Sequence, residues 1–384
     1  MPADQRAFML ESARAGWSYV TREVTRAGFV GATRNYHYLT IWDMASTLAS
    51  AYSARQLGFI SDAQYVQFAG TTLSSMEKLP LYDNAAFNRM YSAGTGAKVD
   101  GRGNVSKKGL GWSALDHGRL LVWLKLVAES DPTLAMRANA IVARLDMKRL
   151  VSGGYMQGEE VSGKTGKPRM YQEGRVGYEQ YAAEGFALWG ANVDSARDFN
   201  INGKPVTVMG QSLLTDVRGG DVMTSEPFVM MGLELGWTGN TWRRLSLAVL
   251  AAQEARFRQT GIVTMVSEDA LPVAPSYFFY YLLYRDGKPF VVTTVSGAMS
   301  ESFPRWVSAK AAFGYHALAP GDYTWRVLQT VKYAGSKTGW TSGVYEGTKS
   351  STKAFNLNTA ALVLESAAYL QHGCAFIVKV CPRP

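Results

Sequence analysis

The sequence has no long apolar run, and it has few charged residues. They make up 18% of the 384 residues, against about 25% in ordinary soluble domains, whereas hydrophobic residues make up 47%. The apolar stretch at 271–284 contains two prolines and is shorter than the roughly 20 residues that a spanning helix needs. We therefore expect no membrane span. The first residues do not form a signal peptide, so the chain is either cytosolic or has lost a leader.

Cysteine and histidine are also scarce, which argues against a metal site. Cys374 and Cys381 are too few for a zinc site by themselves, and the four histidines lie far apart without metal-ligand spacing. We expect no metal and no other cofactor. In an exported protein the two cysteines could form a small disulfide, and in a cytosolic protein they would be inert thiols.

Positive charge exceeds negative charge without being concentrated. The net charge is +9, and the densest basic group is "GKTGKPR" at 163–169. A nucleic-acid-binding protein usually gathers its basic residues on one face or helix. We expect no nucleic-acid partner.

The nucleotide-binding patterns present are poor matches. "GEEVSGKT" (158–165) fits the phosphate-loop pattern, but adjacent glycines precede it, Pro168 follows it, and Glu159 and Glu160 would repel phosphate. The candidate dinucleotide loops lack a third glycine, and no G-x-S-x-G elbow is present. We interpret the phosphate-loop match as accidental.

Helical periodicity recurs along the chain and predicts about a dozen helices. Helix pairs joined by tight turns alternate with long Gly- and Tyr-rich connections at 80–111, 151–172 and 331–354. The segment "LLVWL" (120–124) is apolar on every side, as expected for a helix surrounded by others. This pattern favours a mainly α fold: a single (α/α)6 toroid over residues 1–384, with long loops at one end. Its expected helices are 4–23, 41–58, 61–79, 112–129, 131–150, 173–190, 226–236, 240–259, 275–285, 304–316 and 355–371, with a short strand at 287–295.

Carboxylates at helix starts have two interpretations. Asp43 follows Thr40 and Asp116 follows Ser113 at capping-box spacing, so both carboxylates are expected to cap helices. On the expected helix 173–190, Glu173 shares a stripe with Gln180 and Glu184 and begins just beyond a long loop.

Three further carboxylates complete the candidate set. Glu179 has Arg175 four residues before it, and an ion pair explains it without chemistry. Glu226 also begins a helix, where its charge is favourable, and Glu346 lies in a glycine-bearing loop beside Tyr345. Glycosidic cleavage requires two carboxyl groups, one protonated and one ionised, and aromatic faces suit sugar rings. The set therefore points toward carbohydrate.

Several motifs support this interpretation by resemblance. "TIWDMASTLASAYSARQLGFIS", "LPLYDN", "GWSALDHGRLLVWLK" and "QEGRVGYEQYAAEGFALWG" resemble signatures of a bacterial family of unknown function. The order of "ALDHGRL", "QEGR", "SEPFVMM", "VSED" and "GVYEGTK" is similar to that of the glucoamylase-like domains of endo-β-1,2-glucanases and cyclic β-1,2-glucan synthases. The resemblance covers about residues 40–370.

The resemblance implies an exported, periplasmic or secreted glycoside hydrolase with an (α/α)6 fold. Its substrate would be a β-glucan oligo- or polysaccharide, most simply β-1,2-glucan cut internally with inversion. Glu173 would be the general acid and Glu346 the candidate base, with Asp116 as a third catalytic carboxylate that holds sugar hydroxyls. Substrate-binding residues would be Asp43, Trp112, Arg175, Tyr178, Glu226, Glu268 and Tyr345. "SEPF" departs from the pattern by its proline, and Gly347 departs where the glucanase loop leads to an aspartate.

Two other functions remain open from the sequence. A polysaccharide lyase would use Tyr or His as base on an acidic glycan, for which "RNYHY" (34–38), "GYH" (314–316) and the net charge are suited. A non-catalytic glycan-binding partner of a synthase or exporter would bind sugar and release nothing. The oligomeric state is not encoded in any pattern we find.

Overall fold

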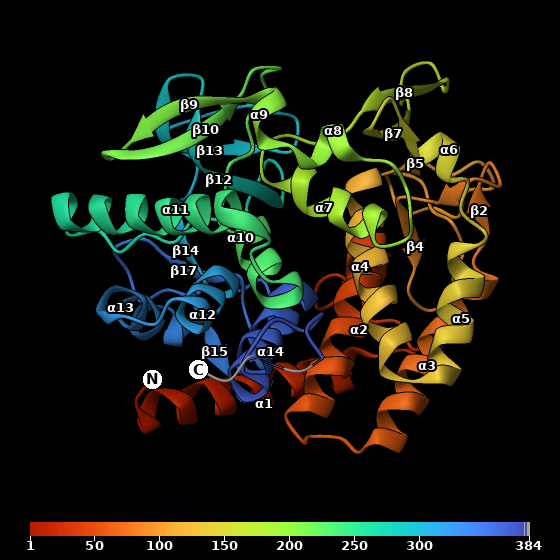
Figure 1. The fold of residues 1–384 in the computed structure, drawn as a ribbon, viewed down its shortest axis with the longest axis horizontal. Coiled ribbons are helices and arrows are strands. Elements are labelled where there is room, and N and C mark those ends of the chain that lie inside the picture. The colour runs from red at the N-terminus through yellow and green to blue at the C-terminus, as the bar shows by residue number, and fades with distance from the viewer. Residues whose placement is uncertain (380, 382–384) are drawn as a thin grey trace. The chain divides into compact units, whose positions relative to one another are not determined.

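The structure is a computed structural model that describes residues 1–379 and 381 (Figure 1). The chain forms two compact units: unit 1 comprises Met1–Tyr19, Arg175–Gly177 and Phe199–Pro384, and unit 2 comprises Val20–Gly174 and Tyr178–Asp198. Helix predominates, which confirms the predicted mainly α class. The (α/α)6 toroid and the single domain stay predictions. Within the described part of the chain, no helix has both the length and the apolar character to span a bilayer.

The helices of unit 2 agree well with the expected pairs. α2 begins at a complete capping box, in which the Thr40 side chain accepts the Asp43 N–H and the Asp43 carboxylate accepts the Thr40 N–H, as predicted. The expected helix 131–150 is broken, because the chain leaves the helix after Val142 and restarts at Met147. The helices are α2 (Ile41–Gln56), α3 (Asp62–Lys78), α4 (Ala114–Ser130), α5 (Pro132–Val142), α6 (Met147–Leu150), α7 (Tyr178–Ala187) and α8 (Asp194–Arg197).

Helix α4 is the central helix of unit 2. It packs against α2, α5 and α7 (Figure 1), and Leu120–Leu124 are completely buried, as the apolar pattern predicts. Glycine sets the spacing between α4 and α7: a Cβ on Gly118 would lie 2.5 Å from the Ala182 backbone oxygen, and one on Gly185 would lie 1.9 Å from the Gly118 oxygen. The two helices therefore cross almost backbone to backbone, which fixes α4 in position.

Unit 2 also contains short strands in the segments expected to be long connections. β7 is the central strand of a four-stranded sheet, where it pairs with β5, β6 and β8. The accidental phosphate-loop match lies on the β7–β8 hairpin, and because no helix begins at Lys164, that interpretation is confirmed. The strands are β1 (Tyr38–Thr40), β2 (Leu81–Tyr82), β3 (Ala86–Phe87), β4 (Met90–Ser92), β5 (Gly111–Trp112), β6 (Val151–Ser152), β7 (Tyr155–Val161) and β8 (Pro168–Gln172).

The prediction that Glu173 begins a helix is wrong. The Glu173 N–H donates to Met156 O at 3.0 Å, so Glu173 continues the β7–β8 ladder, and α7 begins only at Tyr178. Gly174 turns the chain between them with φ of +112°, and a Cβ there would lie 2.8 Å from Glu179 Cβ. The helical stripe predicted for Glu173, Gln180 and Glu184 therefore does not exist.

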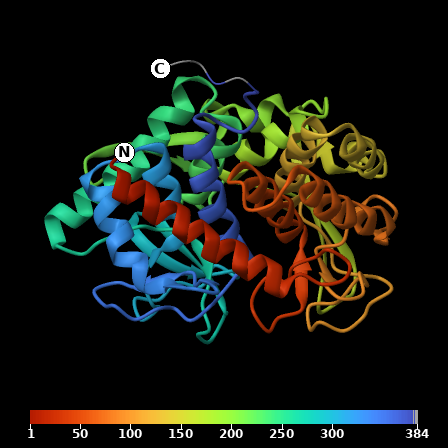
Figure 2. The ribbon, with the colours of Figure 1, turned by 90° about the horizontal axis from the view of Figure 1, so that it is seen from below.

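The helices of unit 1 include the first and last long helices of the chain. Gly16 of α1 lies against Ala360 and Leu364 of α14, and Figure 2 shows α1 crossing α14. α13 was not predicted from the sequence. The helices are α1 (Ala3–Glu23, whose last turn belongs to unit 2), α9 (Phe199–Asn202), α10 (Glu226–Met230), the π-helix η1 (Met231–Leu235), α11 (Gly239–Thr260), α12 (Ala309–Leu318), α13 (Asp322–Val331), the 3₁₀-helix η2 (Lys332–Ala334) and α14 (Leu357–His372).

A three-stranded sheet occupies part of unit 1. β12 pairs with both β11 and β13, so the strand predicted at 287–295 is confirmed and the helix predicted at 275–285 is wrong. The expected helix 304–316 begins as strand β14 and becomes α12 only at Ala309. The strands are β9 (Gly203–Val208), β10 (Gln211–Asp216), β11 (Glu268–Ala270), β12 (Phe278–Arg285), β13 (Lys288–Thr294), β14 (Trp306–Ser308), β15 (Gly335–Ser336), β16 (Gly339–Trp340) and β17 (Gly343–Tyr345).

The C-terminal cysteines are joined. A disulfide links Cys374 and Cys381 just after α14, which ends at Gly373 in the left-handed conformation. Of the two states that the sequence left open, the structure has the bonded one.

Candidate active site

Two carboxyl groups of unit 2 meet at the N-terminus of α4. Ser113 caps this helix by accepting the Asp116 N–H at 3.2 Å and donates its hydroxyl to Asp116 Oδ1 at 3.1 Å. Glu173 arrives from the end of β8, and its Oε2 accepts the Ala114 N–H at 2.5 Å. A helix N-terminus favours negative charge because its first N–H groups are unpaired within the helix. The helix start and the strand end thus bring together two carboxylates 57 positions apart in the sequence.

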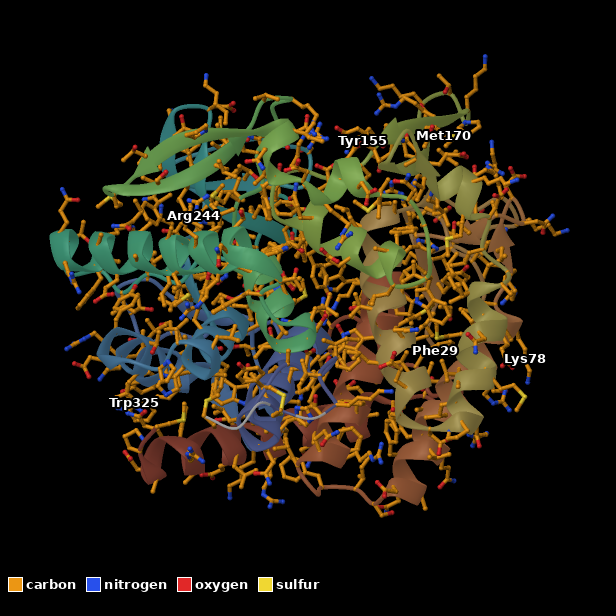
Figure 3. All side chains as sticks on the ribbon, viewed as in Figure 1. Phe29, Lys78, Tyr155, Met170, Arg244 and Trp325 are labelled. Atoms are coloured by element: carbon orange, nitrogen blue, oxygen red, sulfur yellow. A yellow bond between two sulfur atoms is a disulfide. The ribbon has the colours of Figure 1, made fainter. Side chains whose placement is uncertain are left out.

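Tyr171 contacts Glu173 of this carboxyl pair, and Arg89 contacts Tyr171. Tyr171 precedes Glu173 by two residues on extended backbone, so both side chains lie on one face of the hairpin. Met170, the residue before Tyr171, points to the other face and is 46% exposed (Figure 3). The Tyr171 hydroxyl donates to Glu173 Oε1 at 3.3 Å. Arg89 Nη2 donates to the Tyr171 oxygen, and Arg89 Nε donates to Glu159 O at 3.3 Å. Both Glu173 oxygens therefore accept hydrogen bonds from protein groups.

Strand β7 leaves space for the Glu173 side chain by having a glycine, Gly158, at the position that pairs with Tyr171. A Cβ on Gly158 would lie 2.6 Å from Glu173 Oε2 and 2.9 Å from the Tyr171 ring and hydroxyl. A contact this short would displace the carboxylate. Gly158 is thus required by the side chain that it faces.

The environment holds protons on this carboxyl pair at unusually high pH. Burial raises the pKa of Asp116 to about 7, with the negative charge of Glu173 adding to the effect and Arg89 opposing it. Burial also raises the pKa of Glu173, against the opposing charge of Arg89 and the hydrogen bond from Ala114. Among the described residues, none donates a hydrogen bond to Asp116 Oδ2. A carboxyl pair that keeps a proton near neutral pH suits general acid catalysis.

The other residues predicted in unit 2 are buried in its core. Asp43 is 2% exposed within its capping box, and Tyr178 is 5% exposed with its ring 5.9 Å from that of Trp42. Trp112 is fully buried, and its indole N–H donates to Gln157 O at 2.8 Å. In this structure all three act as packing or capping residues.

In unit 1, Glu346 is held in an ion pair. Arg256 donates to both of its oxygens, to Oε1 at 2.8 Å and to Oε2 at 3.0 Å, and the Tyr281 hydroxyl also donates to Oε1 at 2.8 Å. Arg256 lies 4.9 Å from the centroid of the Phe290 ring. The bidentate geometry is the strong form of an arginine–carboxylate contact. Glu346 serves as a base only if this ion pair opens.

Glu226 belongs to a second buried cluster of unit 1. Lys310 of α12 donates to Glu226 Oε2 at 2.6 Å and lies 3.7 Å from Asp269 Oδ1. Asp269 also accepts the Trp306 indole N–H at 2.9 Å and the Ser308 hydroxyl at 2.8 Å, and burial raises its pKa to about 6. Glu226 and Asp269 are both almost completely buried. Glu268, which was predicted here, is half-buried in β11 and alternates with Asp269, so the two side chains point to opposite faces.

Two predicted residues of unit 1 lie outside both clusters. Arg175 donates from Nε to Gly219 O at 2.6 Å. Tyr345 is half-buried at the end of β17, opposite Trp306 of β14, and burial raises its pKa.

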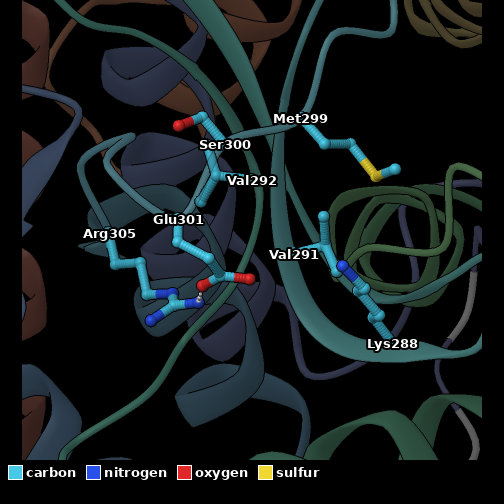
Figure 4. Close-up of a pocket in the computed structure, with 7 residues that line it drawn as sticks. All are labelled: Lys288, Val291, Val292, Met299, Ser300, Glu301 and Arg305. Carbon is cyan, nitrogen blue, oxygen red and sulfur yellow. Dashed lines mark hydrogen bonds and ion pairs between the residues drawn. The ribbon is translucent and has the colours of Figure 1, made fainter.

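Unit 1 also has a small pocket of about 210 Å³ (Figure 4). The ion pair of Arg305 and Glu301, 2.9 Å long, forms one side, and Lys288 reaches in from β13. None of the predicted site residues lines it. The lining is Lys288, Val291, Val292, Met299, Ser300, Glu301 and Arg305.

Metal binding is not supported at the one clustered group of potential ligands found in the described part of the chain. His372, Cys374 and Cys381 have ligand atoms within 4.8 Å of one another. The two thiols are joined in the disulfide, and a disulfide sulfur is not the thiolate that a metal requires.

Sequence reasoning missed Arg89, Tyr171, Asp269 and Lys310. Tyr171 could have been found, because a strand ending at Gln172 places residues 171 and 173 on one face. Arg89 stands alone in a loop, and Lys310 is a single charge in an alanine-rich helix, so no local pattern singles them out.

Comparison with solved structures identifies the fold. The chain is similar to a protein from Bacteroides caccae described as a candidate glucoamylase, with a TM-score of 0.70 and 12% identity over 96% of this chain and 94% of that one. It is also similar to an endo-β-1,2-glucanase from Chitinophaga pinensis, solved with sophorotriose and glucose (TM-score 0.65, 12% identity, 98% and 96% covered). A third similar structure is an endo-β-1,2-glucanase from Talaromyces funiculosus with sophorose (TM-score 0.62, 11% identity, 96% and 85% covered). At these identities the likeness is one of fold.

The family is established by sequence. A family profile described as "Protein of unknown function (DUF3131)" matches residues 11–373, so the chain belongs to this family. No curated protein matches the sequence. The predicted resemblance to a family of unknown function with glucoamylase-like and glucanase-like relatives is therefore confirmed.

Proposed function

We propose that the protein is a glycoside hydrolase that cleaves β-1,2-glucan. The observation that carries the proposal is the carboxyl pair Asp116 and Glu173 at the N-terminus of α4, whose environment raises both pKa values. Glycosidic cleavage needs a carboxyl group that still carries a proton at working pH, and this pair provides one. The fold, shared with endo-β-1,2-glucanases, supports the choice of linkage.

The proposed mechanism keeps the roles that the sequence resemblance implies. Glu173 protonates the leaving oxygen, and Asp116 is the third catalytic carboxylate, which holds sugar hydroxyls. Glu346 is the candidate base that activates water, and cleavage inverts the anomeric centre within the chain. Glu226 and Glu268 are proposed to hold sugar hydroxyls, for which Glu226 would have to leave Lys310.

The further substrate contacts are proposals on the same basis. They are Asp43, Trp112, Arg175, Tyr178 and Tyr345. Because Trp112 and Tyr178 are buried, these two would support the residues that contact the sugar and would not contact it themselves. The disulfide between Cys374 and Cys381 supports an exported, periplasmic or secreted location, because disulfides persist in oxidising compartments.

The structure gives little support to a lyase. Burial and the Glu173 charge raise the pKa of Tyr171 to about 12, which makes it a poor proton acceptor. His117 has both ring nitrogens in hydrogen bonds, and burial lowers the pKa of His316 to about 4. The histidine at 37 is exposed and stays available to this alternative.

Incubation with defined polysaccharides tests the proposal. The protein is mixed with linear β-1,2-glucan, with other β-glucans and with a uronate polymer, and new reducing ends and ultraviolet absorbance are followed together. New reducing ends from β-1,2-glucan alone, without absorbance, support the hydrolase. Absorbance from the uronate polymer would establish a lyase instead, and binding without any product would establish a glycan-binding protein.

A further inference from the structure

We propose that Arg89 is a positioning residue for the candidate acid, and that it acts through the Tyr171 hydroxyl on Glu173. Arg89 lies in the short segment between β3 and β4. The catalytic meaning of this inference rests on the proposed function, but its physical content concerns only contacts within unit 2.

The hydrogen bonds of Arg89 are unusual for a half-buried cation. Its guanidinium donates to the Tyr171 oxygen and to Glu159 O, and it forms no ion pair with a carboxylate of the described residues. Its backbone N–H donates to Gly111 O at 2.9 Å, which fixes the residue beside β5. A guanidinium in such a place usually pairs with a carboxylate, which is its strongest partner. Here a phenol lies between the guanidinium and the nearest carboxylate of the site, Glu173.

The direction of each hydrogen bond in this chain is fixed. A guanidinium has donors and no acceptor, so the Tyr171 oxygen must accept from Arg89. The phenol keeps its own proton, because burial and the Glu173 charge raise the pKa of Tyr171 to about 12. That proton is then directed to Glu173 Oε1. Arg89 therefore polarises the Tyr171 phenol, and the phenol holds the Glu173 carboxylate; we call these two consecutive hydrogen bonds the relay.

The relay favours the ionised form of the pair. Hydrogen bonds to a charged form and a nearby opposite charge both lower a carboxyl pKa. Arg89 does so for Glu173 and for Asp116, against the larger effect of burial. Removing either Arg89 or the Tyr171 hydroxyl should therefore weaken the ionisation of the pair, while the Ala114 N–H still holds Glu173 Oε2.

A second arginine provides a matched control. The guanidinium carbons of Arg89 and Arg169 each lie 5.9 Å from the Tyr171 ring centroid. Arg169 is 70% exposed and donates to Glu160 at 2.7 Å, so its charge is both paired and screened by water. Only Arg89 donates to the hydroxyl. Arg169→Gln removes the same charge at the same distance from the Tyr171 ring without breaking the hydrogen bonds from Arg89 to Tyr171 and from Tyr171 to Glu173.

The test compares four variants of the full chain: Arg89→Gln, Tyr171→Phe, the double variant and Arg169→Gln. Carboxyl titration is followed by carbon NMR on protein labelled at the Asp and Glu side chains, without substrate. We expect Arg89→Gln and Tyr171→Phe each to lower the ionisation constant of the pair by roughly threefold to tenfold. The double variant should match the larger single effect, and Arg169→Gln should leave the titration unchanged.

Three outcomes would overturn the inference: an unchanged titration in folded Tyr171→Phe, additive shifts in the double variant, or an equal shift in Arg169→Gln. Tyr171→Phe keeps the ring that both guanidinium groups lie against and removes only the hydroxyl, so it remains informative if Arg89→Gln does not fold. In active protein, Arg89→Gln and Tyr171→Phe should move the pH profile of kcat/KM to higher pH, whereas Arg169→Gln should not; a merely structural role would leave the profile in place. A shifted titration in a protein that cleaves no glucan would overturn the proposed function and leave the inference standing.

Discussion

The Ala114 N–H of helix α4 donates to Glu173 Oε2, a carboxylate oxygen from a strand that follows it by 59 positions. The first turn of a helix has N–H groups without intrahelical partners, and one of them here stabilises the candidate acid. The structural role of Glu173 and its proposed chemical role therefore depend on the same carboxyl group.

Glu173→Gln separates these two roles. Glutamine keeps the side-chain length and an acceptor oxygen for Ala114, but it carries no acidic proton. If Glu173 is the acid, we expect the rate of reducing-end formation from β-1,2-glucan to fall by about 10²–10⁴-fold at an unchanged melting temperature. Glu160→Gln, on the same hairpin with a side chain 45% exposed, should keep full activity. An active Glu173→Gln protein would rule out Glu173 as the acid.

Gly158→Ala should impair the site through a single methyl group. Its Cβ would lie 2.6 Å from Glu173 Oε2, so either the carboxylate or strand β7 must move. We expect at least a tenfold loss of kcat, since misplacement of a catalytic group by about 1 Å can cost 10²-fold. Gly163→Ala is the control, because nothing lies within 4 Å of the added Cβ at the hairpin tip. Equal activity of the two variants would show that β7 yields without moving Glu173.

Asp116 and His117 should affect stability in opposite directions as pH changes. Asp116 loses its proton near pH 3.8 when unfolded and near pH 7 when folded, so stability falls as pH rises through this window. His117 gains its proton near pH 6.5 when unfolded and near pH 4 when folded, because burial lowers its pKa, so stability falls as pH decreases. Between about pH 4 and 6.5 the two effects largely cancel.

Single variants should reveal both effects in urea denaturation at several pH values. Asp116→Asn should raise the free energy of unfolding at pH 7 by about 1–2 kcal/mol, with the gain vanishing toward pH 4. The same variant should lose stability more steeply on acidification than the parent does, because only the His117 effect remains. His117→Gln should reverse that slope. Parallel pH curves for all three proteins would contradict these assignments.

Lys310→Met should be strongly destabilising. It leaves the carboxylates of Glu226 and Asp269 buried without their cation, and removing one partner of a buried ion pair costs about 3–5 kcal/mol. The double variant with Glu226→Gln should recover part of this loss. Lys125→Met is the control: its ion pair with Glu129 is 3.7 Å long and about one-third exposed, so the change should cost less than about 1 kcal/mol. Similar losses for both lysine variants would show that the Lys310 cluster is not closed to water.

Glu346→Gln tests the candidate base. If Glu346 activates water, turnover should fall by about 10²–10⁴-fold, beyond any loss of stability caused by breaking the Arg256 ion pair. Glu301→Gln breaks the exposed ion pair with Arg305 and should leave turnover unchanged. Turnover within a few-fold of the parent in folded Glu346→Gln would confine Glu346 to holding Arg256, and the base would have to be sought elsewhere.

Most helices could be predicted from the sequence. α3 and α11 bury one face with helical period, whereas α2, α4 and α14 are long apolar segments that are buried on nearly every side. α2, α3, α4, α11 and α14 begin and end close to the expected positions, and the Thr40 and Ser61 caps explain two of these starts. The segment 275–285 could not be assigned in this way, since a short continuous apolar run suits a buried strand as well as a helix. Its pairing with β13 decided the outcome.

The candidate site was predictable only in part. Asp116 and Glu173 could be found as site residues by resemblance, Glu173 on the wrong secondary structure. The capping spacing of Asp116 predicted only a helix cap, and its carboxylate accepts the Ser113 hydroxyl instead of completing a capping box. Arg89 could not be found, because its role depends on the pairing of β7 with β8, which places Tyr171 beside it. Lys310 and Asp269 depend in the same way on contacts between segments 41 residues apart.

The absence of a side chain at Gly158 also has a consequence for engineering. Because Glu173 rests against this position, β7 cannot be used to alter substrate preference there without disturbing the acid itself. At the hairpin tip, Gly163, five residues further along, has nothing within 4 Å of an added Cβ, so we expect it to tolerate insertions or labels. One β-hairpin therefore offers both an attachment point for probes and a position that must be left untouched.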